Sequence, residues 1–329
     1  MELQFGLTLP QRGLDLGVFE TAAEMVDLAR AAEGEPRFDS VWVGDSLTAK
    51  PRLESLSLLG ALAGATSRLR LGVGCMASFP VRDVLTFAYQ WASLDVISGG
   101  RMDLAACTGL VPANKASARE GAHWGVLDKE RAPRLEDNIR ACRLLWSGDE
   151  VSFEGTHTSF DDFRLATVPL QDPCPVWIAA NPFPGPFYER ALRRVATLAD
   201  GWQTVGLFPD MMGSSWSALK GYLDEAGRDI DAFPRMAYHN VNLNPDRSAA
   251  LDESVRFIEA YYGKGSFTPA MVESWTAAGS VEQAAADLRA VAASGATAVT
   301  LRMTSWDQQG QYERLVSELL PALAGLEVA

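Results

Sequence analysis

The chain is poor in the residues that build disulfide frameworks and metal centres. It has four cysteines and three histidines among 329 residues. No two cysteines have CxxC spacing, and the histidines stand far apart at positions 123, 157 and 239. A zinc site or a disulfide framework needs several such residues at close spacing. The sequence therefore predicts neither, and we expect no metal ion in the functional site.

Basic charge and long apolar runs are also scarce. Lysine and arginine number 29 against 42 aspartates and glutamates, which gives a formal net charge of −13. Binding to nucleic acid or to an anionic membrane surface needs basic residues, so we expect neither as a partner. No apolar run is long enough to span a bilayer, and no basic, apolar leader starts at Met1. We therefore expect a soluble, cytoplasmic protein.

The sequence lacks the common fingerprints of self-sufficient catalytic sites. The first strand-like run is followed by no GxGxxG motif, and no Walker loop is present. Neither a Ser-His-Asp order nor a carboxylate pair at a specific spacing stands out. These absences indicate that a bound cofactor, rather than a set of side chains alone, carries the chemistry.

What is present is a regular alternation of two apolar patterns. Runs of strand type alternate with segments whose apolar residues recur at helical spacing. The predicted strands span residues 3–9, 38–44, 69–75, 101–108, 175–180, 199–205, 235–243 and 296–303. The predicted helices span residues 19–32, 53–66, 82–97, 132–146, 186–198, 211–226, 249–262, 280–293 and 311–323.

This alternation predicts an α/β fold, a (β/α)8 TIM barrel, in a single domain over residues 1–329. An open doubly wound sheet is the second choice, weakened by the missing GxGxxG motif. Insertions are expected near 109–129, 150–172 and 263–279. In the second of these, residues 150–163 alternate around a glycine turn and predict a β-hairpin.

In a barrel of this type the functional site lies at the carboxyl ends of the strands. Asp45 and Ser46 end the second strand, where they either cap the next turn or contact a bound ring. Gly72 and Gly74 precede the stretch 75–78. Glycines in a strand mark a bulge or a close approach by a ligand, unless they serve tight packing alone.

Two further strand ends carry residues suited to anions. Asn181 precedes Pro182 at the start of a helix, where backbone N–H groups bind phosphate well. The alternative is an Asn-Pro turn with no ligand. Arg302 ends the last strand, and it either holds an anionic group bidentately or serves as an internal ion-pair partner.

The histidines offer one candidate acid or base. His123 lies beside Trp124 in the long segment after the fourth strand, where a lid would form. A histidine there can act as a general acid or base near neutral pH, although a structural role is equally compatible with the pattern. His239 and Asn240 belong either to a buried polar network or to a row of residues facing the substrate.

Several motifs together resemble one known family. They are FDSVWVGDSL (38–47), TSRLRLGVG (66–74), ASLDVISGGRMDLAACTG (92–109), RLEDNIRACRLLWSGDEVSFEGTHTSF (134–160), PVWIAANP (175–182), RRVATLADGW (193–202) and GSVEQAAADLRAVAASGATAVTLR (279–302). In this combination the chain resembles the bacterial luciferase-like family of flavin-dependent oxidoreductases. The resemblance covers nearly the whole chain.

The resemblance implies a (β/α)8 barrel with insertions, usually a homodimer or higher oligomer. It also implies FMN, or the deazaflavin coenzyme F-420 (F420 below), at the mouth of the barrel. By this resemblance, Met76, Ala77 and Ser78 form a bulge behind the isoalloxazine ring, which in the family often holds a non-proline cis peptide. Thr108 and Gly109 lie beside the ring, and Ala180 and Asn181 form the turn that binds the phosphate.

The chain departs from the family pattern in three places. Many members carry a histidine after the acidic residue that ends the second strand, and this chain has Ser46. The fourth strand often ends in a glycine-rich run, and here it reads LAACTG. The phosphate turn is usually richer in glycine and serine than AANPFPG.

From these features we predict a two-component monooxygenase. It would take reduced FMN from a separate flavin reductase and use O2 on a small organic substrate, in a pocket that excludes water. The predicted catalytic residues are His123, Asp45, Ser46 and Asn240. Trp42, Phe79 and Trp124 are candidate walls of the pocket, with core packing as the default for each.

Three alternatives stay open. The nearest is an F420-dependent oxidoreductase that transfers hydride without oxygen. Another is a catalytically silent relative that binds flavin. The last is a cofactor-free lyase or aldolase, which would need a Schiff-base lysine at a strand end, where lysines are scarce.

Overall fold

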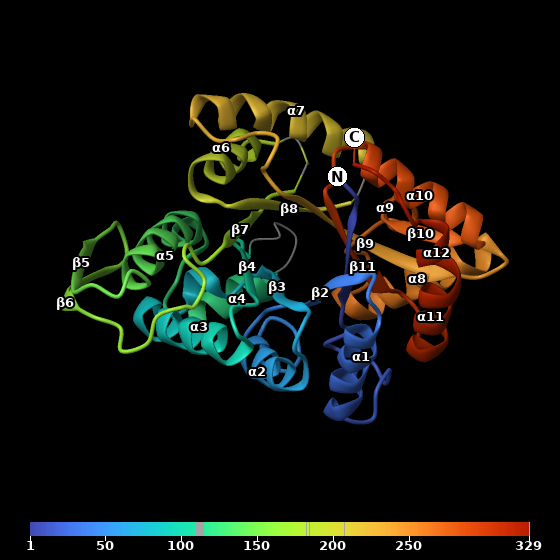
Figure 1. The fold of residues 1–329 in the computed structure, drawn as a ribbon, viewed down its shortest axis with the longest axis horizontal. Helices are drawn as coiled ribbons and strands as arrows, with labels where there is room; N and C mark the ends of the chain where they lie inside the picture. The colour runs from blue at the N-terminus through green and yellow to red at the C-terminus, as the bar shows by residue number, and fades with distance from the viewer. Residues whose placement is uncertain (110–114, 182, 184, 207, 329) are drawn as a thin grey trace.

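The computed structural model describes residues 1–109, 115–181, 183, 185–206 and 208–328. Eight parallel strands form a barrel with helices around it (Figure 1). The barrel strands are β1 (Gln4–Thr8), β2 (Phe38–Val43), β3 (Arg70–Met76), β4 (Met102–Ala106), β7 (Val176–Ala179), β8 (Gly201–Val205), β9 (Arg235–Leu243) and β11 (Ala298–Met303). Pairing of β9 with both β8 and β11 closes the barrel. The predicted fold class is confirmed.

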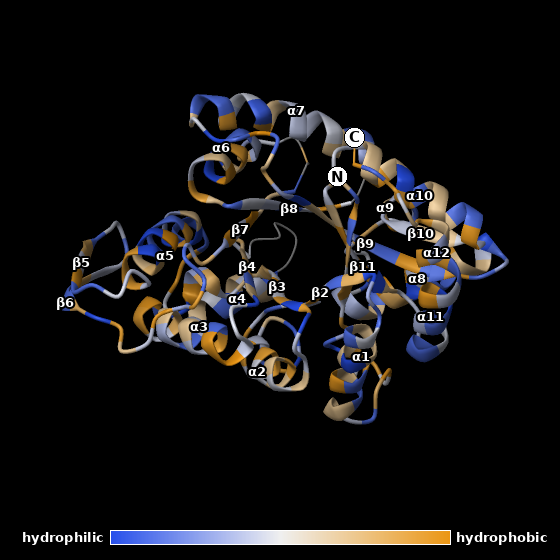
Figure 2. Cartoon of the chain, viewed as in Figure 1, coloured by the Kyte–Doolittle hydropathy of each residue, from blue (hydrophilic) through white to orange (hydrophobic). Residues whose placement is uncertain are grey.

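Helices cover the outside of the barrel. They are α1 (Ala22–Gly34), α2 (Ser55–Ala65), α3 (Val84–Ser98), α4 (Lys115–His123), α5 (Arg131–Leu145), α6 (Tyr188–Leu198), α7 (Pro209–Glu225), α8 (Arg247–Tyr262), α9 (Pro269–Ser274), α10 (Val281–Ala293), α11 (Gln308–Arg314) and α12 (Leu320–Ala322). Figure 2 shows hydrophobic and hydrophilic residues mixed along these outer helices. No helix in the described part of the chain is long and apolar enough to cross a membrane.

Local sequence explains where these elements begin and face. Helix α10 starts at a capping box formed by Ser280 and Gln283, which satisfies free N–H groups of the first turn. Its apolar residues, including Leu288 and Val291, are buried. Strand β4 is buried along its whole length, as expected for a parallel strand covered on both faces.

The three predicted insertions have different outcomes. The β-hairpin is confirmed as β5 (Val151–Glu154) paired antiparallel with β6 (Ser159–Phe163), at the edge of the molecule beside α5 (Figure 1). The segment 109–129 contains α4 and a short 3-10 turn, and its residues 110–114 lie outside the described residues. The segment 263–279 holds α9 and an additional strand, β10 (Thr276–Gly279), which the sequence analysis missed.

Strand β10 changes the mouth of the barrel. The first half of β9 pairs with β8, from Arg235 opposite Trp202 to Tyr238 opposite Val205. The second half pairs with β10, from Asn240 opposite Thr276 onward. Strand β9 therefore exchanges one neighbour for another halfway along, and Phe267 and Trp275, which flank α9, lie at the carboxyl end of the barrel.

Candidate functional site

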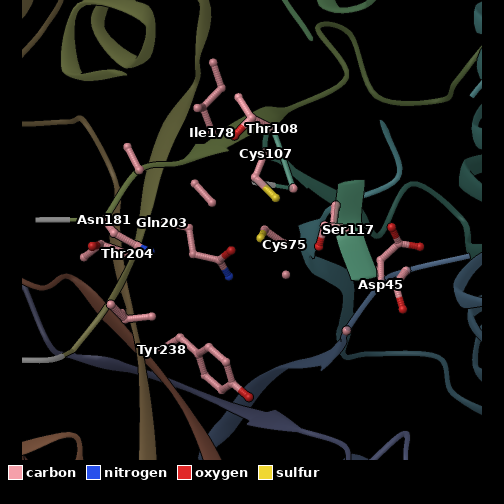
Figure 3. A pocket seen from close by; sticks show the side chains of 18 of the residues that line it. Asp45, Cys75, Cys107, Thr108, Ser117, Ile178, Asn181, Gln203, Thr204 and Tyr238 are labelled. Atoms are coloured by element: carbon pink, nitrogen blue, oxygen red, sulfur yellow. The ribbon is translucent and has the colours of Figure 1, made fainter. Parts of the chain in front are cut away.

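A cavity of about 470 Å³ opens at the carboxyl ends of the barrel strands (Figure 3). Seven of the predicted site residues line it: Asp45, Ser46, Ala77, Thr108, Gly109, Ala180 and Asn181. The other predicted site residues, Met76, Ser78, His123 and Asn240, are not in its lining. The part of the phosphate turn at Pro182 and Pro184 lies outside the described residues.

The floor of the cavity is built at the end of β3. The register between β3 and β4 shifts between Gly74 and Met76, and the Gly74–Cys75 peptide bond is cis. The bulge therefore lies one to two residues before the predicted stretch 76–78. Met76 is fully buried, and the Cys75 side chain lines the cavity instead. A Cβ atom at Gly74 would collide with the Gln203 amide and lie 2.9 Å from Trp42, so only glycine fits here.

Asp45 connects the loops that follow β2 and β3. Its Oδ1 accepts a hydrogen bond from the Ser55 hydroxyl at 2.6 Å, and its Oδ2 accepts one from the Ser78 N–H at 2.7 Å. The Arg82 guanidinium lies 3.4 Å from Oδ1. These partners use both carboxylate oxygens, so Asp45 holds the rim of the cavity in place.

Two buried polar groups of β8 have no hydrogen-bond partner among the described residues. The Nε2 of Gln203 and the Oγ1 of Thr204 make no hydrogen bond, although both side chains are buried and line the cavity. Figure 3 shows the Gln203 amide projecting into the cavity toward Cys75. Buried polar groups in proteins are almost always paired, so these two atoms indicate the place of a bound molecule. The sequence analysis missed both residues, although GWQTV carries two polar residues in a buried strand.

Two cysteine thiols also face the cavity (Figure 3). Cys75 and Cys107 are both unoxidised and hydrogen-bonded to each other. This hydrogen bond lowers the pKa of Cys75 and, together with burial, raises that of Cys107.

Positive charge and aromatic rings gather on another side. The Lys50 ammonium lies 4.1 Å from the ring centroid of Tyr262, and Arg52 stands nearby in the same loop. Burial, and then the like charges of Arg52, Arg12 and Arg302, lower the pKa of Lys50 to about 7. The aromatic lining here consists of Tyr238, Tyr261, Tyr262, Phe267 and Trp275.

The three aromatic residues named as candidate walls do not line the cavity. Trp42 packs beneath Gly72 and Gly74, Phe79 packs against Phe87 and Trp124 is 46% exposed, and none of the three lines the cavity. The sequence could not distinguish them from the lining rings, because aromatic residues at a strand end and in a core have the same local pattern.

His123 and Asn240 lie away from the cavity surface. His123 is the exposed last residue of α4 and stacks on Trp124, with ring centroids 6.3 Å apart. Asn240 is fully buried, and its Oδ1 accepts hydrogen bonds from Arg302 at 3.0 and 2.7 Å. Burial lowers the pKa of the neighbouring His239 to about 4, which keeps it neutral at pH 7. The catalytic roles of His123 and Asn240 stay predictions.

Glu120 of α4 is a lining residue that sequence analysis did not identify. One of its carboxylate oxygens accepts backbone hydrogen bonds from Leu47, Thr48 and Ala49 at 2.7, 2.6 and 2.8 Å. The side chain is buried. Glu120 therefore fixes the loop after β2, which carries Lys50 and Arg52.

Comparison with known proteins finds many relatives and many structural neighbours. The chain is 31% identical over 274 residues to a Gordonia bronchialis protein named F420-dependent glucose-6-phosphate dehydrogenase, across 80% of this chain and 76% of the relative. An F420-dependent secondary alcohol dehydrogenase matches with a TM-score of 0.77 at 17% identity, over 98% of this chain and 99% of that one. A monooxygenase from Streptomyces bottropensis matches with a TM-score of 0.78 at 19% identity, over 98% and 100%. At these identities the two structures show the fold alone.

The prediction of a two-component monooxygenase supplied with reduced FMN was wrong. The Gordonia relative is named a dehydrogenase that depends on F420, which favours the hydride-transfer alternative. The motifs that carry the family resemblance could not make this distinction, because members that bind FMN and members that bind F420 share them.

The match to a protein family covers nearly the whole chain. The model of the luciferase-like monooxygenase family matches residues 3–298, from β1 to the start of β11. The matched region contains the loops that form the cavity, from the end of β1 to β10. The chain therefore belongs to the luciferase-like monooxygenase family.

Proposed function

We propose that this chain is an F420-dependent oxidoreductase, which transfers hydride between the deazaflavin and a small organic substrate without an oxygen step. The observation that carries the proposal is the relative named for F420, which matches across 80% of the chain. A separate flavin reductase is then not required as a partner.

The cavity lining is compatible with a flat deazaflavin ring. Its floor is tightly packed at Gly74 and Gly109: a Cβ atom at Gly74 would collide with the Gln203 amide, and one at Gly109 with the carbonyl oxygen of Ala77. The unpaired Gln203 amide and Thr204 hydroxyl supply polar partners for a ring that presents hydrogen-bonding groups at its edge. We propose that these four residues hold the coenzyme, with Ala180 and Asn181 near its phosphate.

When bound, F420 would supply the two-electron hydride chemistry. The residues of this chain would hold the ring against the β3 floor and exclude water from its reacting face. The aromatic lining at Tyr238, Tyr262 and Trp275 gives an apolar side on which the substrate can lie.

A side-by-side binding titration tests the proposal. The purified protein is titrated anaerobically with F420 and with FMN, each oxidised and reduced, and the reduced mixtures are then exposed to air. We expect F420 to bind at least tenfold more tightly than FMN, and no oxygen adduct to form. Tight binding of reduced FMN followed by an oxygen adduct would contradict the proposal. Binding of F420 without turnover over a panel of alcohols, aldehydes and enones would support the catalytically silent alternative instead.

A further inference from the structure

Four cationic side chains converge on one side of the cavity from three parts of the fold. Lys50 and Arg52 belong to the loop after β2, Arg12 follows β1, and Arg302 lies in β11. Lys50 and Arg52 line the cavity, and Arg302 lies behind them, with its guanidinium 5.1 Å from the ring centroid of Tyr262. We call Lys50, Arg52 and Arg302 the cationic corner.

The cationic corner has no carboxylate partner. Among the ion pairs found in the described part of the chain, none includes Lys50, Arg52 or Arg302, whereas Arg12 pairs with Asp15. Arg302 is instead satisfied by Asn240 and by the Tyr262 hydroxyl at 2.8 Å. The Nε of Arg52 is buried without any acceptor. Lys50 and Arg52 are half-buried at the cavity surface. Cationic groups there without an ion-pair partner favour an anion at this place.

The other acidic residues of the cavity are already engaged. Asp45 is bonded to Ser55 and Ser78 and pairs with Arg82. Glu120 is bonded to three backbone N–H groups. Neither carboxylate forms an ion pair with Lys50, Arg52 or Arg302 in the described part of the chain, which favours an anionic ligand there.

The corner is held rigidly before any ligand arrives. A Cβ atom at Gly44 would collide with Nη1 of Arg52, so the absence of a side chain there makes room for the guanidinium. Arg12 donates to the carbonyl oxygens of Pro51 and Tyr261, which ties the lysine loop to the end of α8. Lys50 is packed on the face of Tyr262. Such preorganisation lowers the entropic cost of binding.

The corner lies across the barrel from the predicted phosphate turn. The corner's residues come from β11 and from the loop after β2, the two neighbours of β1. Strand β7, which precedes Asn181, is four strands from β1 in either direction around the closed barrel. Figure 3 likewise shows Asn181 and Asp45, which precedes the lysine loop, on opposite sides of the cavity. A coenzyme with its phosphate near Asn181 leaves the corner to the second reactant.

We propose that the cationic corner binds an oxyanion group, a carboxylate or a phosphate, of the substrate. Arg52 lines the cavity, and its guanidinium N–H groups form a fork that matches such a group. Lys50 adds an ammonium beside it, and Arg302 acts from behind as a positioning charge. The inference rests on the proposed function only in assigning the opposite side to F420.

Binding of inorganic phosphate at pH 6.5, measured by calorimetry, tests this inference. We expect R52M and K50M each to weaken phosphate binding by about tenfold or more. Both should change F420 affinity less than twofold. K220M, which removes an exposed lysine on α7, is the matched control and should change neither. Unchanged thermal unfolding of each variant shows that the fold is intact.

Two outcomes would overturn the inference. Phosphate that binds R52M and K50M as tightly as the unsubstituted protein would show that the corner is not the anion site. F420 affinity that falls in these variants as far as phosphate affinity would assign the corner to the coenzyme's phosphate. If F420 fails to bind at all while phosphate binding still depends on Arg52 and Lys50, the proposed function fails and the oxyanion site stands.

Discussion

The two sides of the cavity present chemically different groups to a ligand. The floor, formed at the ends of β3, β4 and β8, is uncharged and leaves the polar atoms of Gln203 and Thr204 without partners. The cationic corner brings together Lys50, Arg52 and Arg302, and no ion pair found among the described residues includes any of them. Unpaired neutral groups suit the edge of a ring, whereas unpaired cations suit an anion. One cavity therefore has two binding regions of different chemistry, which favours the binding of two reactants.

The largest expected effect comes from filling the floor. Gly109 has φ of +68° and a Cβ atom there would collide with Ala77, whereas Gly125 has φ of +70° with nothing within 4 Å. We expect G109A to lower the free energy of unfolding by about 2–4 kcal/mol and to abolish F420 binding. We expect G125A to cost about 1 kcal/mol, because it carries the backbone penalty alone. Denaturant unfolding and F420 titration measure both; equal losses in the two variants would contradict the predicted close contact.

A smaller effect is expected from removing one polar group of the floor. We expect Q203L to weaken F420 binding by about tenfold, because the ring loses a hydrogen-bond partner. Its stability without ligand should not fall, because the Gln203 Nε2 has no partner within the chain to lose. Phosphate binding should be unchanged. A variant that loses stability but keeps its F420 affinity would show that Gln203 is structural.

The corner, unlike the floor, should respond to pH. The pKa of Lys50 is about 7, so its ammonium loses its proton as pH rises through neutrality, and anion binding should weaken. Arg12, Arg52 and Arg302 stay charged, and Cys75 is the titrating thiol nearby. Sulfate, whose charge is constant in this range, should bind about five- to tenfold more weakly at pH 9 than at pH 6.

Two variants show which group causes this pH dependence of anion binding. K50M should flatten it, while C75S should retain it. A profile that persists in K50M would assign the titration to Cys75 rather than to the lysine.

The smallest effect is expected at His123. It is exposed at the end of α4 and does not line the cavity. We expect H123A to change F420 and phosphate binding less than twofold, as for a surface substitution. A larger loss of F420 or phosphate binding would place His123 itself in the ligand site and revive the predicted role of this histidine.

Sequence periodicity predicts the scaffold well. All eight barrel strands lie within or close to the predicted runs, because buried parallel strands between amphipathic helices leave a strong apolar signal. Strand β10 escapes prediction because TAAG is four residues long and lacks β-branched alternation. The C-terminal segment, predicted as one helix, is helical without a break over 308–322, with a π-helical stretch at 315–319 between α11 and α12.

The functional residues are less visible in sequence than the scaffold. Asp45, Thr108 and Asn181 were identified because strand ends are predictable. Lys50 and Arg52 were missed because their significance depends on Tyr262 and Arg302, which are distant in sequence and meet them only in the fold.

Titration of F420 in the presence and absence of saturating inorganic phosphate tests the two-sided cavity most directly. The account predicts that F420 affinity changes less than twofold, because the ring lies on the floor and phosphate in the cationic corner. An F420 affinity that falls in proportion to phosphate concentration would contradict it, since the two ligands would then compete for one site.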